Sequence, residues 1–168
     1  MDELKQYAIA YTISNILAVL SIAGALQKPR WTRIGLAAVF LWASYVNSNI
    51  ALYEPARYLE YNRFTIVPIY KDFINGFFST HIRQIVIPIA IAQFLIFAGL
   101  LRGGIWTKLA CIGGILFGLS ITPLGIGSAF PATLLMAIAF FILLIKYDHQ
   151  PIWRKKEHES PTKIISPK

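Results

Sequence analysis

The chain contains five long windows with almost no charged side chains, and this feature strongly limits the folds open to it. A helix needs roughly 20 mostly apolar residues to cross about 30 Å of hydrocarbon. The windows are residues 7–26, 34–53, 85–101, 105–121 and 131–147. Lys108 and Lys146 lie near window ends, where their long side chains reach the headgroups. The sequence therefore predicts an all-α integral membrane protein with five spans.

The composition argues against other broad classes of protein. Hydrophobic residues make up 56% of the 168 residues and charged residues 14%, against about 25% charged in an average soluble domain. A net charge of +8 first suggests nucleic-acid binding, but this apolar content does not suit a soluble domain. We therefore expect no nucleic-acid partner. Disorder of the whole chain is excluded for the same reason, and the single Cys111 excludes a disulfide scaffold.

The first window is the most polar of the five, which leaves its placement open. Its polar side chains are Thr12, Ser14, Asn15 and Ser21. The alternative to five spans is four spans preceded by a helix that lies in the membrane interface. We do not expect a cleaved signal peptide, because Asp2 and Glu3 outweigh Lys5 where a signal peptide is basic.

The distribution of Lys and Arg predicts the orientation in the cell membrane. With five spans, one side holds five of the 16 basic residues, namely Lys5, Arg57, Arg63, Lys71 and Arg83. The others lie in the two short turns, near window ends and in the tail. Because basic residues stay in the cytoplasm, the N-terminus is predicted outside and the C-terminus inside.

Residues 1–147 are predicted to form one transmembrane domain, and residues 148–168 a basic cytoplasmic tail. The tail is polar and rich in proline, so we expect it to be mostly disordered. Arg154, Lys155 and Lys156 would contact anionic headgroups, at about 1 kcal/mol for each residue. The cluster is either a plain topology anchor or a site for a specific partner.

The outer loop, residues 54–84, is rich in aromatic side chains. Helical spacing within 66–78 places five apolar or aromatic residues on one face: Ile66, Tyr70, Phe73, Ile74 and Phe77. This pattern predicts an amphipathic helix at the outer interface. Two interpretations remain open: an ordinary interfacial helix, or a lid in which Tyr70, Phe73 and Phe77 cover a cavity for a lipid-like or quinone-like ligand.

The start of the third membrane helix is also open. If Ser79 or Thr80 caps this helix, Pro88 falls inside it and should kink it. If the helix begins near Ile87 instead, Pro88 lies in the first turn, where a proline is tolerated.

The sequence offers no catalytic or metal-binding set. No span carries an ionisable residue at its centre, although ion-coupled transporters usually need one. His81 is the only histidine before the tail, so one copy cannot supply two axial haem ligands inside the membrane. Cys111 is expected to be an inert buried residue. We therefore predict no catalytic residue and no metal site, and the chain is not expected to be an enzyme on its own.

The remaining candidates are neutral polar side chains inside the spans. An unpaired amide in hydrocarbon costs several kcal/mol, so each of these amides must find a partner. They act either as interhelical contacts worth about 0.6–2 kcal/mol or as the lining of a ligand pocket. The candidate ligand-binding residues are Gln93, Asn47, Asn49, Asn15 and Tyr45. Close helix packing is expected at Gly99, Gly113, Gly114 and Gly118.

From the second window onward, over about residues 31–147, the chain resembles the DoxX-like family of small membrane proteins. The resemblance rests on Arg33–Leu41 (RIGLAAVFL), on 89–114 (IAIAQFLIFAGLLRGGIWTKLACIGG) and on 121–144 (ITPLGIGSAFPATLLMAIAFFILL). It implies a four-helix bundle, to which the first window adds one N-terminal helix. The family often has an acidic residue in place of Gln93 and a lysine near Asn47 or Asn49. In this chain both places hold neutral amides, and this difference argues against charge-dependent chemistry here.

Some DoxX-like proteins are subunits of quinone-linked sulfur oxidation or quinol oxidase complexes, and others scaffold oxidative-stress enzymes. The main functional hypothesis is therefore a non-catalytic membrane subunit or scaffold with a lipid or quinone pocket between its helices. One alternative is the membrane subunit of a quinone-linked oxidoreductase, with Gln93, Asn47 and Tyr45 near the headgroup. Another is a small binder or transporter of lipid or hydrophobic solute. The expected partners are membrane lipids and either another protein or a second copy.

Overall fold

The computed structural model describes residues 2–146 and 150–153, with side chains from residue 8 onward. The long helices are α1 (Asp2–Gln27), α2 (Pro29–Tyr53), α4 (Ile82–Arg102), α5 (Gly104–Ile121) and α6 (Ala132–Lys146). The short helices are η1 (Pro55–Arg63), α3 (Pro68–Phe73), η2 (Ile74–Phe78) and η3 (Thr122–Ser128). No strand occurs within these described residues, so the predicted all-α class is confirmed.

Within the described residues, four segments are long and apolar enough to cross a membrane: Ala8–Gln27, Pro29–Tyr53, Ile82–Arg102 and Gly104–Ser128. Each coincides with a predicted window. Helix α6 covers the fifth window but has only 15 residues, which is about 22 Å at 1.5 Å per residue. The structure therefore supports a multi-pass membrane protein.

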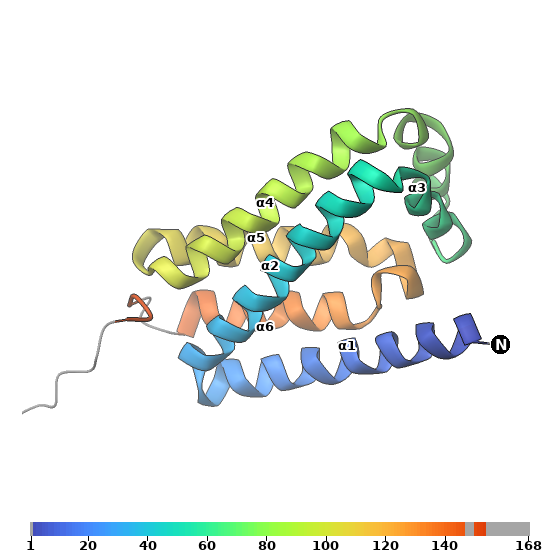
Figure 1. Cartoon of the computed structure of the whole chain (residues 1–168). Coiled ribbons are helices and arrows are strands. Elements are labelled where there is room, and N and C mark those ends of the chain that lie inside the picture. Colours follow the sequence, from blue (N-terminus) through green and yellow to red (C-terminus); the bar gives the residue numbers. More distant parts are fainter. Residues whose placement is uncertain (1, 147–149, 154–168) are drawn as a thin grey trace, which may run out of the picture.

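The long helices lie side by side, and Figure 1 shows α1 and α6 below α2 and α4. Helix α2 packs mainly against α4, α5 packs between α4 and α6, and α1 packs against α6 and the start of α2. We call the end that holds the α1–α2 turn, the α4–α5 turn and residues 150–153 the tail end. The opposite end, with residues 54–81 and 122–131, is the loop end. Helix α1 begins at the loop end and α6 finishes at the tail end.

The larger apolar core lies where α2, α4, α5 and α6 meet. Phe40 of α2 stands edge-on to Phe117 of α5 and to Phe140 of α6, with ring centroids 5.6 and 5.4 Å apart. Phe40 and Phe140 are almost fully buried. Edge-to-face aromatic pairs add about 0.5–1.5 kcal/mol beyond the area they bury, so these rings hold three of the helices together.

Two glycines of α5 bring it close to α6. A Cβ atom on Gly114 would lie 2.6 Å from the ring of Phe140, and one on Gly118 would lie 2.8 Å from the backbone oxygen of Thr133. A larger residue at either position would push the two helices apart. The predicted close packing at these glycines is confirmed.

Helix α4 begins at Ile82, directly after His81, and Pro88 lies inside it. The Ser79 hydroxyl donates to the Gly76 oxygen at 2.7 Å, and the Thr80 hydroxyl donates to the Phe77 oxygen at 3.0 Å. Neither side chain caps α4. Of the two alternatives, the structure shows the one with Pro88 inside the helix. The side-chain cap at Ser79 or Thr80 that belonged to this alternative is absent, because both hydroxyls bond back to the preceding turn.

The outer loop does not form one continuous helix over 66–78. It contains η1, α3 and the π-helical turn η2, and the backbone of Gly76 is non-helical. The expectation of one amphipathic helix is wrong here, because a glycine without a Cβ allows the chain to leave the helix. Of the five residues expected on one face, Ile74 is buried, whereas Ile66, Phe73 and Phe77 are exposed.

The uncharged segment before α6 folds back onto the outer loop. Gly125 has a φ of +65° and lies directly against the Phe64 backbone oxygen, a combination that only glycine accepts without strain. The Ile66 N–H donates to the Pro123 oxygen at 3.3 Å. This packing provides the protein surroundings that irregular backbone near a membrane requires.

Candidate functional site

Three polar side chains form a chain of hydrogen bonds between α2, α4 and η1. The Asn47 amide nitrogen Nδ2 donates to Gln93 Oε1 at 2.8 Å. The Tyr58 hydroxyl donates to Asn47 Oδ1, also at 2.8 Å. Gln93 is 1% exposed and Tyr58 is 7% exposed. We call these three residues the polar triad.

A second contact beside the triad fixes how α2 faces α4. The Ser44 hydroxyl donates to the Ala90 backbone oxygen at 2.7 Å. Ser44 lies three residues before Asn47, and Ala90 three residues before Gln93, so each pair shares one helix face. The two helices are thus joined by two polar contacts one turn apart, which aims the Gln93 side chain at α2.

One atom of the triad has no partner. Gln93 Nε2 is buried and makes no hydrogen bond with any residue that the structure describes. Exchanging the oxygen and nitrogen of both amides would preserve the contacts but leave Gln93 Oε1 unpaired instead. Either way the chain of hydrogen bonds ends in an unsatisfied group, at a cost of about 1–3 kcal/mol.

Tyr58 closes the triad from the loop end. Its ring stacks on Tyr61 at 6.1 Å and meets Phe78 edge-on at 6.3 Å between ring centroids. It also belongs to a buried cluster with Ala51 and Val86. Burial, and secondarily the nearby Tyr61, raises the pKa of Tyr58 to about 12. The hydroxyl therefore stays protonated at neutral pH.

The other candidate ligand-binding residues lie outside the triad. Asn49 donates to the Tyr45 backbone oxygen of its own helix at 2.9 Å, and Asn15 donates to the Tyr11 oxygen in the same way. The Tyr45 side chain is 67% exposed. The structure thus brings together Gln93 and Asn47 only, and ligand contact at Asn49, Asn15 and Tyr45 stays a prediction.

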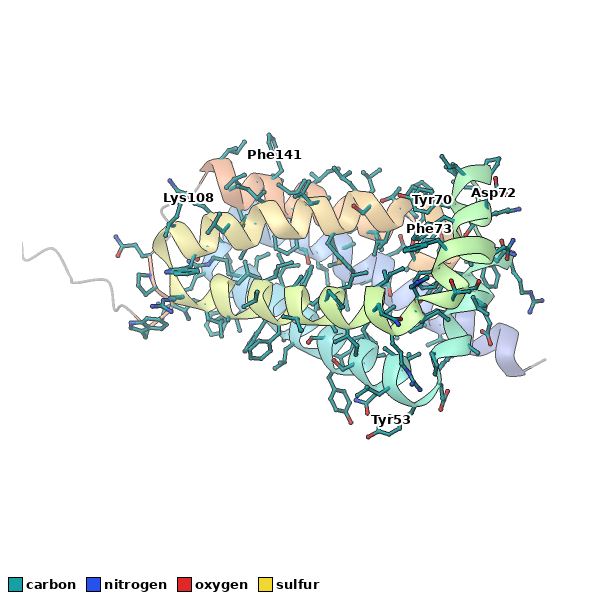
Figure 2. All side chains as sticks on the ribbon, turned by 90° about the horizontal axis from the view of Figure 1, so that it is seen from above. Tyr53, Tyr70, Asp72, Phe73, Lys108 and Phe141 are labelled. Carbon is teal, nitrogen blue, oxygen red and sulfur yellow. The ribbon has the colours of Figure 1, made fainter. Side chains whose placement is uncertain are left out.

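The residues expected to form a lid lie at the loop end, as Figure 2 shows for Tyr70 and Phe73. The Tyr70 hydroxyl donates to the Ser120 oxygen of α5 at 3.0 Å. The rings of Phe73 and Phe77 lie 6.2 Å apart. Tyr58 is the loop residue that reaches the amides, and sequence reasoning did not single it out from the other loop aromatics.

The remaining site predictions fall partly outside the structure. Arg154, Lys155 and Lys156 lie outside the described residues. Within the part of the chain that is described, no group of three or more His, Cys, Asp or Glu side chains is placed to hold a metal ion. Cys111 is a free, buried cysteine.

Comparison with known proteins does not assign the chain to a family. No family model matches the sequence. No curated protein and no solved structure matches it either.

Proposed function

We propose that this chain is a DoxX-like, non-catalytic membrane subunit or scaffold that holds a lipid or a quinone at the polar triad. The observation that carries the proposal is the buried Gln93 Nε2 without a hydrogen-bond partner. An unsatisfied polar group inside a membrane bundle is costly. A bound ligand removes that cost by supplying the missing hydrogen bond.

The surroundings of the amide define the chemistry of the ligand. With the amides as placed, Gln93 presents N–H donors, so the matching ligand group is a carbonyl oxygen, as in a quinone ring or a lipid ester. The neighbouring buried side chains Val86 and Ala90 are apolar, which suits a ligand with a hydrocarbon body. Tyr58 covers the amides from the loop end, so a headgroup that enters from that end must displace the Tyr58 ring.

The arrangement in the membrane is part of the same proposal. We assign helices α2, α4, α5 and α6 to the four-helix bundle that the resemblance implies, and α1 to the added N-terminal span. We place the N-terminus outside and the C-terminus in the cytoplasm. This orientation puts the basic turns of the tail end on the cytoplasmic side, as expected from the distribution of Lys and Arg.

The test is a pair of glutamine variants on one helix. Gln93→Met removes the donor at similar volume, and Gln84→Met makes the same change at an exposed position of α4. Native mass spectrometry after purification in mild detergent should show lipid or quinone retained by the wild type and by Gln84→Met. We expect Gln93→Met to retain at least several-fold less. Thermal unfolding of both variants shows whether a loss of retained lipid or quinone comes from misfolding instead.

Two results would contradict the proposal. One is wild-type protein, extracted as mildly as possible, that carries no lipid or quinone in a fixed ratio. The other is equal retention by folded Gln93→Met and Gln84→Met. The scaffold role is tested in the same preparation, because it predicts that a protein partner copurifies with the wild-type chain.

A further inference from the structure

Arg33 is a buried cation at the tail end, and the proposed ligand site does not use it. It is 5% exposed and lies 14 residues before Asn47 on α2, which is about 21 Å along the helix. Its Nε and Nη2 atoms donate to the Leu100 oxygen at 3.0 and 2.5 Å. Nη2 also donates to the Thr107 hydroxyl at 2.9 Å, and Nη1 donates to the Gln150 oxygen at 2.7 Å.

Within the described part of the chain, the hydrogen-bond acceptors around the Arg33 guanidinium are all neutral. They are two backbone oxygens and a hydroxyl, and Thr107 itself donates to the Gly99 oxygen at 2.9 Å. The carbonyls at the end of α4 carry partial negative charge, but they do not amount to a counter-ion. A buried charge that has no counter-ion among the residues the structure describes is costly, so this site favours an anion.

Arg30 lies one turn before Arg33 and reaches toward the same segment of chain. Its Nη2 atom donates to the Ile152 backbone oxygen. Two guanidinium groups thus hold two carbonyl oxygens, those of Gln150 and Ile152, which are two residues apart. Guanidinium groups bind phosphate oxygens by the same donor geometry and more strongly, because the acceptor is then charged.

Residues 150–153, which we call the tail strap, lie across the α4–α5 turn, beside the yellow helix ends in Figure 1. The Ile152 N–H donates to the Leu101 oxygen at 3.4 Å, a long hydrogen bond. At Gly103 a Cβ atom would lie 2.5 Å from the Pro151 nitrogen. The strap is therefore closely fitted to the turn, and two of the hydrogen bonds that hold it there come from the guanidinium groups of Arg30 and Arg33.

Two exposed tryptophans lie next to the arginines and the strap. Trp31 is 70% exposed and directly follows Arg30, and Trp153 is 68% exposed and ends the strap. Tryptophan is enriched where a membrane protein meets the headgroups. Two exposed tryptophans beside two arginines are therefore a pattern typical of the headgroup level, where lipid phosphates are found.

We infer that Arg30 and Arg33 form a phosphate site at the tail end, and that the tail strap is a displaceable cover over it. The Gln150 and Ile152 oxygens occupy the positions that two phosphate oxygens take when the strap opens. The phosphate belongs either to an anionic phospholipid or to a free phosphate ion. This inference does not depend on the ligand at Gln93.

The experiment uses the full chain in three nanodisc preparations. One contains phosphatidylcholine only, one also contains phosphatidic acid, and one contains phosphatidylcholine with inorganic phosphate in the buffer. Hydrogen–deuterium exchange at the Ile152 amide reports the opening of the strap. We expect phosphatidic acid to speed this exchange several-fold and native mass spectrometry to show retained phosphatidic acid. Faster exchange with inorganic phosphate alone would instead identify the free ion as the ligand.

The matched variants are Arg30→Gln and Arg102→Gln. Both change an exposed arginine at the tail end, but the Arg102 guanidinium lies over the ring of Trp106 at 5.0 Å from its centroid. In Arg30→Gln, the phosphate ligand should no longer speed exchange at the Ile152 amide to any large extent. In Arg102→Gln, the increase in exchange should be the same as in the wild type. Unchanged exchange in all three preparations, or equal loss in both variants, would overturn the inference. These variants avoid the buried Arg33, whose substitution could unfold the bundle.

Discussion

At the residue scale, Tyr58 links the outer loop to the amides inside the bundle. Its hydroxyl donates to Asn47 Oδ1, and Asn47 in turn donates to Gln93. Removing one hydroxyl would therefore leave a second unsatisfied atom beside Gln93 Nε2. A single phenol oxygen thus contributes both to the stability of the loop end and to the shape of the proposed ligand site.

The first prediction concerns Tyr58 and high pH. Its folded-state pKa is about 12, above the ordinary value of about 10, so the folded protein favours the protonated form. This stability is fully present below about pH 10 and is lost as the pH rises to about 12. Titration of tyrosinate absorbance should show one late-ionising group fewer in Tyr58→Phe than in the wild type.

Tyr58→Phe should also lower the free energy of unfolding near neutral pH by about 1–3 kcal/mol, because it leaves Asn47 Oδ1 unpaired. The matched control is Tyr53→Phe, which changes a side chain that is 78% exposed. An equal number of late-ionising groups in Tyr58→Phe and in the wild type would refute the assignment.

At the scale of elements, the packing of α5 against α6 depends more on the close approach of the two helices than on the volume of the side chains between them. Gly114 lies against the ring of Phe140. Apolar surface alone does not drive helix association in lipid, so close packing of this kind supplies much of the attraction. Helix α6, the shortest of the five long helices, gains its stability from α1 and α5 on either side.

The second prediction is that Gly114→Ala destabilises the bundle by about 1–3 kcal/mol, because the added methyl overlaps the Phe140 ring. Gly35→Ala is the matched control, since a Cβ atom at Gly35 meets nothing within 4 Å. This control should be neutral or slightly stabilising, because alanine favours a helix over glycine by up to about 1 kcal/mol. Thermal unfolding in one detergent compares the two variants, and equal losses would argue against close packing at Gly114.

At the scale of the whole molecule, the two ends of the bundle differ in charge and in structure. The tail end holds short turns and buried Arg33, whereas the loop end holds η1, α3 and η3. Figure 2 shows Lys108 at the tail end and Asp72 at the loop end. Both side chains are exposed, so they report on which side of the membrane each end lies.

The third prediction follows from this placement. In a Cys111→Ala background, Asp72→Cys should react with a membrane-impermeant maleimide in intact cells. Lys108→Cys should react only after the membrane is opened. Labelling of both positions in intact cells would contradict the five-span arrangement, and the reversed pattern would contradict the proposed orientation.

The sequence by itself determined the helical class, the positions of the membrane helices and the amides that need partners. Hydropathy is a local property, so windows such as 34–53 correspond closely to α2. The prediction that Gln93 needs a hydrogen-bond partner is also local. It requires only the position of the amide inside an apolar window and the cost of burying it.

Only the tertiary structure decided which polar groups meet. Gln93 pairs with Asn47 and not with Asn15, because the rotation and packing of α2 against α4 set the contact, and hydropathy does not encode helix rotation. Tyr58 reaches the amides because η1 folds back over the bundle. As a sequence feature, Arg33 contributed only to the predicted orientation. In the structure it is buried, because residues far along the chain, Leu100 and Gln150, supply its acceptors.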